Sequence, residues 1–136
     1  MTLIIDASVA IAWIAADEMN AYADGALNAC GSDPAIVPQL GYWEIANTLL
    51  VFERKGRLRN AVSAYADLLE QIPLVSDGAS NRKNGGVEEM MLARKHRLSV
   101  YDTSYLATAM RSGVPLAKLD TLLMEAAIAE GVYFAV

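Results

Sequence analysis

Short apolar runs alternate with longer helix-forming segments along this chain, and that alternation constrains the possible folds more than any other feature. The short runs predict strands at Leu3–Ile5, Ala35–Val37, Leu74–Val75, Pro115–Leu119 and Val132–Phe134. The longer segments predict helices that begin near Asp6, Asn20, Leu40, Asn60, Val87, Ser99 and Asp120. Strands that alternate with helices form a parallel sheet covered on both faces. We therefore expect a single α/β domain over residues 1–136, an α/β/α sandwich around a central, mainly parallel sheet of about five strands.

Several polar residues and glycines mark the ends of these elements. Ser8 is expected to cap the first helix, and Ser99 and Asp102 have the S-x-x-D spacing of a capping box. Gly31 and Gly56 follow helical segments and are expected to end them. The stretch 77–86 is rich in glycine and polar residues and is predicted to be a loop.

Composition excludes several classes of protein. Of the 136 residues, 54% are hydrophobic and 20% are charged, which excludes an intrinsically disordered chain. The formal net charge of −5 excludes coating of nucleic acid by bulk positive charge. No apolar run approaches the roughly 20 residues of a membrane span, and no basic segment opens a signal peptide. Cys30 is the only cysteine and fits a reducing compartment, so we expect a cytoplasmic protein.

Aspartates stand where predicted strands end or predicted helices begin. Asp6 follows the first strand, Asp120 follows the fourth, and Asp102 lies in the first turn of the helix that starts at Ser99. The ligand crevice of an open parallel sheet lies beyond the carboxyl ends of its strands, where helix N-termini also point. Each aspartate taken alone also fits a helix cap. Their common placement at one edge of the sheet favours a shared site.

Glu44 lies in a segment, Leu40–Phe52, that is apolar around nearly its whole helical circumference. Such a helix is expected to be buried on most of its surface, and a buried glutamate is rare unless it is paired. Its neighbours on the same helix face, Leu40 and Asn47, offer no positive charge. Glu44 is therefore a candidate site residue, and a narrow solvent-exposed face is the alternative explanation.

If Asp6, Glu44, Asp102 and Asp120 converge, their mutual repulsion must be relieved by protonation or by a cation. Carboxylate oxygens suit Mg²⁺ or Mn²⁺, and the scarcity of histidine and cysteine argues against zinc. A divalent ion held by carboxylates beside a cleft suits phosphodiester hydrolysis, because it polarises the phosphoryl group and activates water.

Other chemistry finds less support. His96 is the only histidine, so no Ser-His triad can form, and Gly85-Gly86 lacks the lysine of a phosphate-binding loop. The basic segments 54–59, 82–83 and 94–97 would hold an RNA backbone if they flank the acidic site. Solvated helix ends are the alternative interpretation of these segments.

Motifs that resemble those of PIN domains occur in order along the chain. They are Leu3–Val9 around Asp6, Trp43–Asn47 around Glu44, Leu98–Ala107 around Asp102, and Pro115–Asp120 followed by Leu123. The length and the ending Glu130–Val132 resemble the VapC toxins of bacterial and archaeal toxin–antitoxin pairs. Each motif is short, but together and at these intervals they are specific, and the resemblance spans essentially the whole chain.

The resemblance implies a PIN-like fold and a metal-dependent endoribonuclease that cleaves RNA. It assigns Asp6, Asp102 and Asp120 to the metal, Mg²⁺ or Mn²⁺, and it assigns Glu44 a catalytic role, directly or through a bound water. Lys118 departs from the family pattern, which commonly has a threonine two residues before the last aspartate. Its ammonium group would compete with the metal or contact the scissile phosphate.

The resemblance also implies partners: usually a second copy of the chain in a homodimer, and a small cognate antitoxin that holds the enzyme inactive. A hydrophobic content of 54% in so small a chain independently favours an apolar interface. By family analogy, Tyr22–Leu27 and Leu49–Phe52 are candidates for the antitoxin groove.

Other interpretations of the acidic residues stay open. A PIN-like scaffold would bind RNA or protein without cutting. A receiver-type signalling domain, with Asp77 as phosphate acceptor, would need adjacent acids after the first strand, whereas Asp6 stands between Ile5 and Ala7. A phosphatase of the haloacid dehalogenase type would need an aspartate at the position of Ser8.

Overall fold

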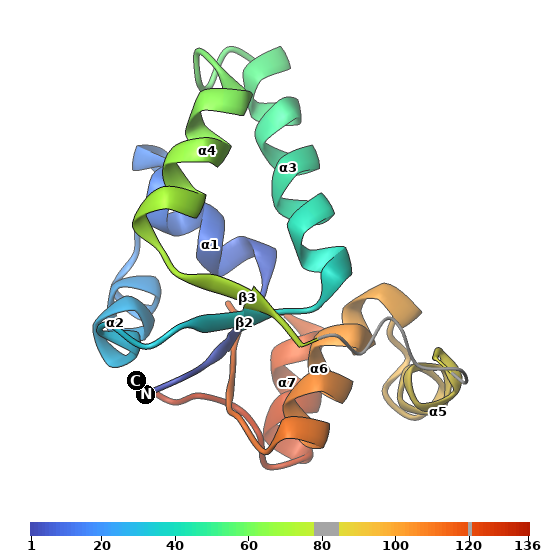
Figure 1. The fold of residues 1–136 in the computed structure, drawn as a ribbon. Coiled ribbons are helices and arrows are strands. Elements are labelled where there is room, and N and C mark those ends of the chain that lie inside the picture. Colours follow the sequence, from blue (N-terminus) through green and yellow to red (C-terminus); the bar gives the residue numbers. More distant parts are fainter. Residues whose placement is uncertain (78–84, 120) are drawn as a thin grey trace.

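The computed structural model describes residues 1–77, 85–119 and 121–136 (Figure 1). In chain order its elements are β1 (Ile4–Ile5), α1 (Ala7–Ile14), the short 3₁₀ helix η1 (Ala16–Glu18), α2 (Ala21–Cys30), β2 (Ala35–Val37), α3 (Gln39–Arg54), α4 (Ala61–Gln71), β3 (Leu74–Ser76), α5 (Val87–His96), α6 (Val100–Ser112), β4 (Leu116–Ala117) and α7 (Leu122–Ala129). The predicted α/β class is confirmed, and η1 was not predicted.

The strands form one parallel sheet in the order β3-β2-β1-β4. The described sheet has four strands where about five were predicted. The predicted last strand makes only an isolated parallel bridge, from Tyr133 to Leu116. The strand order also excludes the receiver-type alternative, because that fold places its third strand beside the first, whereas here β3 lies at the edge next to β2.

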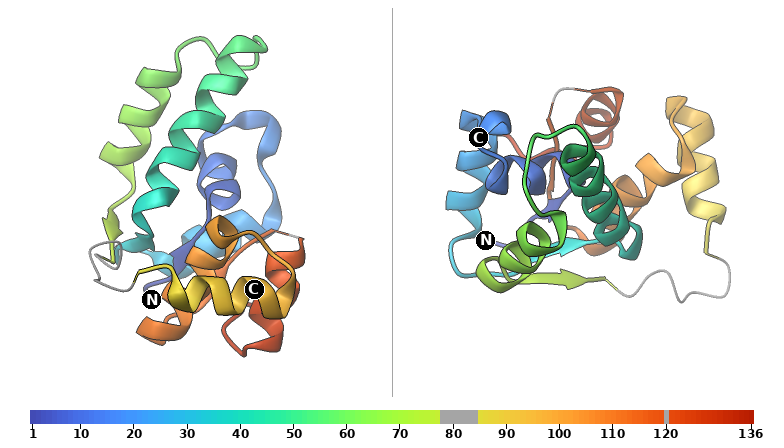
Figure 2. Two further views of the ribbon diagram at one scale, coloured as in Figure 1. Left: turned by 90° about the vertical axis from the view of Figure 1, so that its right-hand side faces the viewer. Right: turned by 90° about the horizontal axis from the view of Figure 1, so that it is seen from above.

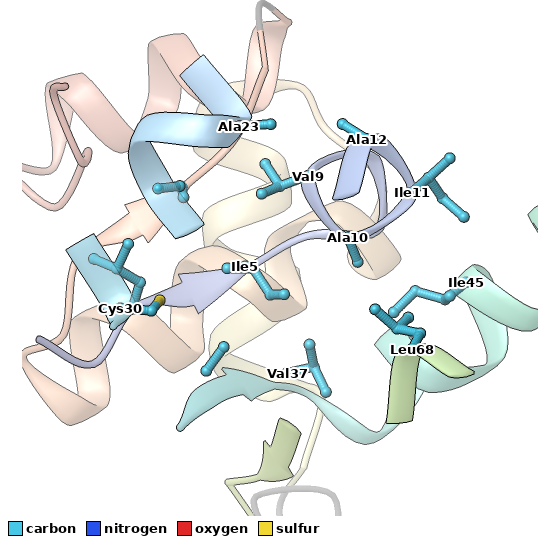
Figure 3. Close-up of a cluster of buried hydrophobic side chains, with 14 of the residues drawn as sticks. Ile5, Val9, Ala10, Ile11, Ala12, Ala23, Cys30, Val37, Ile45 and Leu68 are labelled. Carbon is cyan, nitrogen blue, oxygen red and sulfur yellow. The ribbon is translucent and has the colours of Figure 1, made fainter. Parts of the chain in front are cut away.

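Successive strand residues point to opposite faces of the sheet, and each face has its own hydrophobic core. Ile5 packs with α1 to α4 in a cluster that includes Val9, Cys30 and Leu68 (Figure 3). Ile4, the preceding residue, packs on the other face with helices α5 to α7. The sheet is therefore the middle layer of an α/β/α sandwich.

Side-chain caps begin most of the helices. Asn20, Asn60 and Ser99 accept hydrogen bonds from backbone N–H groups of the first turns of α2, α4 and α6, as their positions in the sequence predict. The prediction for α1 is wrong in one respect. Its cap is the carboxylate of Asp6, which accepts from the backbone N–H of Val9, and Ser8 lies inside the helix.

The predicted burial of α3 is also wrong. Only Gly41, Ile45 and Leu49 are fully buried in this helix, while Trp43 is 67% exposed. Figure 2 shows the reason: α3 and α4 form an antiparallel pair that extends away from the sheet, so α4 and α1 cover part of α3 and the rest of its surface faces solvent. Within the described residues, no helix combines the length and apolar character needed to cross a membrane.

Candidate active site

The candidate site lies where the chain reverses its order across the sheet. From β1 the chain proceeds to β2 and β3 on one side and then returns to β4 on the other side of β1. Ligand sites of open parallel sheets lie beyond the carboxyl ends of strands at such a point. Asp6 follows β1 directly, and Lys118 follows β4 directly.

Both oxygens of the Asp6 carboxylate have partners. Oδ1 accepts hydrogen bonds from the Ser8 hydroxyl at 2.7 Å and from the Val9 backbone N–H at 3.3 Å. Oδ2 forms a salt bridge with the Lys118 ammonium group, whose Nζ also lies 3.5 Å from Ser8 Oγ. The side chains of Lys118 and Asp6 are only 13% and 6% exposed, so this ion pair is buried.

Two stacked tyrosines hold the backbone of Lys118. Its N–H donates to the Tyr22 hydroxyl at 3.2 Å, and its carbonyl accepts from the Tyr133 hydroxyl at 3.4 Å. The two rings are 5.9 Å apart and inclined by 12°. Tyr22 in turn donates to the Phe134 carbonyl at 2.8 Å. The backbone of Lys118 is thus held by hydrogen bonds on both sides of its Cα.

Glu44 projects from α3 and accepts a hydrogen bond of 2.9 Å from the hydroxyl of Tyr105 on α6. Burial raises the pKa of Glu44 above its ordinary value, and the charges of Asp102 and Asp6 raise it further. The Tyr105 hydrogen bond and the positive charge of Lys118 act in the opposite direction. Burial, and then the charge of Glu44, raises the pKa of Tyr105, so its hydroxyl stays a donor to the carboxylate.

Asp6, Glu44, Asp102 and Lys118 line one pocket of about 260 Å³. The Ser99 cap places Asp102 in the first turn of α6, where its side chain is exposed to solvent. Asp120, the remaining predicted ligand, lies outside the described residues. Among the described residues, no three His, Cys, Asp or Glu side chains are placed as ligands of one ion.

The chemistry of this pocket suits a hard cation. Its acidic groups are carboxylates, the preferred ligands of Mg²⁺ and Mn²⁺. Burial is the main cause of the raised pKa of Glu44, and the charges of Asp102 and Asp6 add to it. Lys118 already places one positive charge against Asp6. In their donor chemistry the residues of this pocket therefore fit a divalent ion, and Lys118 is the positive charge that the chain itself supplies to the carboxylates.

The predicted basic segments are only partly available to a ligand. Arg57 binds Asp17 and Glu18 at 2.8 and 2.6 Å, with its guanidinium 3.7 Å from the centre of the Phe52 ring. Lys95 and His96 both contact Glu130, and their hydrogen bonds lower the pKa of that carboxyl. Residues 82–83 lie outside the described part of the chain.

The sequence did not single out Tyr105, although a signal for it exists. Tyr105 lies three residues after Asp102 on α6, so the two side chains share one helix face. A helix face that presents Asp102 to the pocket therefore turns residue 105 toward the same side. The pairing of Tyr105 with Glu44, 61 residues away, depends on how α3 and α6 pack.

Comparisons with known proteins agree with the fold. The sequence profile of the PIN domain matches residues 3–128. The chain is 29% identical over 127 residues to Ribonuclease VapC3 of Pyrobaculum aerophilum, which covers 92% of this chain and 94% of that protein. The fold is similar to the crystal structure of PAE2754, also from Pyrobaculum aerophilum, with a TM-score of 0.67 and 20% identity over 93% of this chain and 84% of the other.

Proposed function

The chain belongs to the PIN domain family, and from this premise we propose that it is a metal-dependent endoribonuclease that acts as the toxin of a toxin–antitoxin pair. The observation that carries the proposal is the single pocket lined by Asp6, Glu44 and Asp102 at the carboxyl end of β1. Similarity to Ribonuclease VapC3 over most of both chains supports RNA as the substrate.

Asp6, Asp102 and Asp120 are the residues that would hold Mg²⁺ or Mn²⁺. The ion, when bound, supplies polarisation of the phosphoryl group and activation of water. Ser8 and the Val9 N–H orient Asp6 through Oδ1 and leave Oδ2 to a cation. Tyr105 fixes the orientation of Glu44 by the hydrogen bond to Oε2.

Glu44 is the residue proposed to accept a proton from water. Its raised pKa makes it a stronger proton acceptor than an ordinary carboxylate. Because water and not the ribose 2′-hydroxyl attacks phosphorus, the products are a 5′-phosphate and a 3′-hydroxyl.

The experiment incubates purified protein with structured RNA in Mn²⁺ or in EDTA, beside Asp6→Asn, Glu44→Gln and the control Asp67→Asn, which alters an exposed aspartate on α4. Each site variant should lose about 10²- to 10³-fold in rate, the usual effect of removing one positioned electrostatic group, and the control should cleave normally. Cleavage that persists in EDTA or in both site variants, or that leaves 2′,3′-cyclic phosphates, contradicts the mechanism.

A catalytically silent PIN-like scaffold is the second candidate function, and one observation favours it. Lys118 already neutralises Asp6, so the pocket is electrostatically supported without a metal. The same experiment separates the two functions, because a scaffold would cleave RNA neither in Mn²⁺ nor in EDTA.

We also propose that the chain forms a homodimer and binds an antitoxin on the α3–α4 pair. An apolar groove of about 370 Å³ lies between these helices. Leu50, Val62 and Leu69 line it and are 37%, 75% and 44% exposed. Of the two segments predicted for the antitoxin groove, Leu49–Phe52 contributes Leu50 to this groove. In the other, Tyr22–Leu27, the hydroxyl of Tyr22 already donates a hydrogen bond to the Phe134 carbonyl. Light scattering of the purified chain tests the dimer, and a monomer at tens of micromolar contradicts it.

A further inference from the structure

A second pocket adjoins the candidate active site. It encloses about 360 Å³ between the α5–α6 connection, the first turn of α6, the end of β4 and the start of α7. Asp102 and Lys118 line both pockets, so the two hollows share a wall. A ligand that reaches the carboxylates from this side must pass the second pocket.

Arg97 brings a positive charge to this pocket. It is exposed, and among the described residues its guanidinium makes no hydrogen bond or ion pair. Two other arginines are engaged: Arg57 by Asp17 and Glu18, and Arg111 by Asp77 at 2.9 Å. Arg97 is thus a guanidinium at the pocket mouth that is free to pair with an anion.

The backbone at Arg97 carries strain that glycine would relieve. Arg97 ends α5 with φ 56° and ψ 44° and has the only positive φ among the described non-glycine residues. Gly113 performs the same task at the end of α6, with φ 67° and ψ 24°. The left-handed conformation is unfavourable for any residue with a Cβ, so strain retained here indicates a role for the side chain.

The rest of the pocket wall combines the polar residues Ser99 and Thr121 with an apolar surface. Leu98, Leu122 and Leu123 line it, and Leu122 is 61% exposed to solvent. A flat base packs on such a surface, while a guanidinium binds phosphate through paired N–H donors. A nucleotide carries both groups, and the pocket volume lies within the range of small-ligand sites, about 300–1,000 Å³.

We infer that this pocket binds one unpaired nucleotide of an RNA strand beside the scissile bond, with Arg97 on its phosphate and the leucines against its base. The inference rests on the proposed ribonuclease function and deepens it. Bases in a duplex are stacked and cannot enter, so the strand must be single-stranded where it binds. The net charge of −5 makes this local cation necessary, because the domain as a whole repels RNA.

The test measures binding of a short fluorescein-labelled single-stranded RNA by anisotropy, in EDTA and over a series of NaCl concentrations. The variants are Arg97→Gly, Arg97→Lys and the control Arg94→Gln, which removes one charge from the last turn of the same helix but lies outside the pocket lining. Arg97→Gly should weaken binding about tenfold, as expected for a charge-assisted hydrogen bond. It should also lower the salt slope by about 0.7, the value of one phosphate contact on a single strand.

Two further readouts identify the cause. Arg97→Gly should raise the melting temperature by roughly 2–4 °C, because glycine relieves the backbone strain, so its loss of RNA binding cannot come from unfolding. Arg97→Lys should keep most of the salt slope, whereas Arg94→Gln should leave both affinity and slope near wild type. Equal effects of Arg97→Gly and Arg94→Gln, unchanged binding by Arg97→Gly, or no binding by the wild-type protein each overturn the inference.

Cleavage measured in parallel with Mn²⁺ separates this inference from the proposed function. If the wild-type protein cleaves RNA and Arg97→Gly binds RNA as well as wild type does, the nucleotide pocket is refuted and the proposed ribonuclease function stands. If RNA binding depends on Arg97 but no metal-dependent cleavage occurs, the proposed ribonuclease function is refuted and the nucleotide pocket stands.

Discussion

Replacement of Lys118 by methionine tests the electrostatics of the candidate site most directly. Methionine keeps an unbranched apolar stem of similar length but removes the charge that neutralises Asp6. The Ser8 hydroxyl and the Val9 N–H remain on Asp6 Oδ1, while Oδ2 loses its only charged partner. The variant therefore leaves a buried carboxylate with two of its three partners and no positive charge beside it.

The expected loss of stability follows from the burial of this pair. Removing one member of a buried ion pair usually lowers the free energy of unfolding by about 3–5 kcal/mol, because the other charge is left uncompensated. The remaining hydrogen bonds to Asp6 place Lys118→Met at the lower end, about 3 kcal/mol. For a domain of this size that corresponds to a melting temperature lower by roughly 10 °C.

Divalent metal should reverse much of this loss. In the wild-type protein an ion at Asp6 must displace the Lys118 ammonium group from Oδ2, whereas in the variant that oxygen is open. Mn²⁺ should therefore bind Lys118→Met more tightly, and each tenfold gain in affinity adds about 1.4 kcal/mol to the stabilisation at saturating metal. Urea unfolding with and without Mn²⁺, together with calorimetric titration of Mn²⁺, measures both effects.

Lys95→Met is the matched control. Lys95 also pairs with a carboxylate, Glu130 at 2.6 Å, but its side chain is 63% exposed. Exposed ion pairs contribute about 0–1 kcal/mol, so this variant should unfold near wild type and respond to Mn²⁺ as wild type does. If Lys118→Met is as stable as Lys95→Met, or if Mn²⁺ stabilises wild type and Lys118→Met equally, Lys118 does not compete for the metal position.

Three further predictions concern the Glu44 side of the pocket. Because the pKa of Glu44 is raised above its unfolded value of 4.5, the folded state binds more protons between the two pKa values, and the free energy of unfolding falls as pH rises through that window. Glu44→Gln should therefore be more stable than wild type at neutral pH, with the difference vanishing in acid, as followed by thermal melts from pH 4 to 8. Tyr105→Phe removes the 2.9 Å hydrogen bond to Glu44; it should lower the free energy of unfolding by about 1–2 kcal/mol and raise the pKa of Glu44 further, measured by urea unfolding and by NMR titration of the carboxyl. Gly41→Ala would place a Cβ 3.2 Å from both the Tyr105 hydroxyl and Val37 Cβ. It should lower the free energy of unfolding by about 1–3 kcal/mol and displace the Tyr105 hydroxyl from Glu44. An unchanged Glu44 pKa in the NMR titration would contradict that displacement.

The parts of the fold that the sequence predicted are those fixed by local chemistry. Asn20, Asn60 and Ser99 each satisfy backbone N–H groups within three residues, so the start of each helix is specified by a short stretch of chain. Gly31 and Gly56 follow helices α2 and α3 with positive φ for an equally local reason. Such signals need no knowledge of the tertiary structure.

The errors occurred where burial depends on what lies across from an element. The apolar circumference of Leu40–Phe52 predicted a buried helix, yet Trp43 is 67% exposed because α4 and α1 cover only part of α3. Val132–Phe134 has the residues of a strand, but only Tyr133 forms a bridge and no further strand extends the sheet there. Hydrophobicity predicts that a surface is apolar, and it does not identify which element packs against that surface.

The candidate site was predictable in its carboxylates and not in their partners. Asp6 and Asp102 were found because strand ends and helix starts mark the crevice of a parallel sheet. The partner of Asp6 is 112 residues away, and it lies there because β4 is the neighbour of β1. That adjacency follows from the order of strands in the sheet, which the sequence does not state.

The Lys118–Asp6 pair also links the stability of this domain to its metal chemistry. Burial, and then the charges of Asp102 and Asp6, raise the pKa of Glu44, and a cation beside these carboxylates opposes that effect. Lys118 supplies that cation from the chain itself, at a position where the family pattern commonly has a hydroxyl. In the proposed metal site the ammonium group and a divalent ion would compete for Asp6 Oδ2, so removal of Lys118 should lower the stability of the metal-free protein and raise its metal affinity together. A purely structural lysine would produce only the first change, and a lysine that only contacts substrate would produce neither.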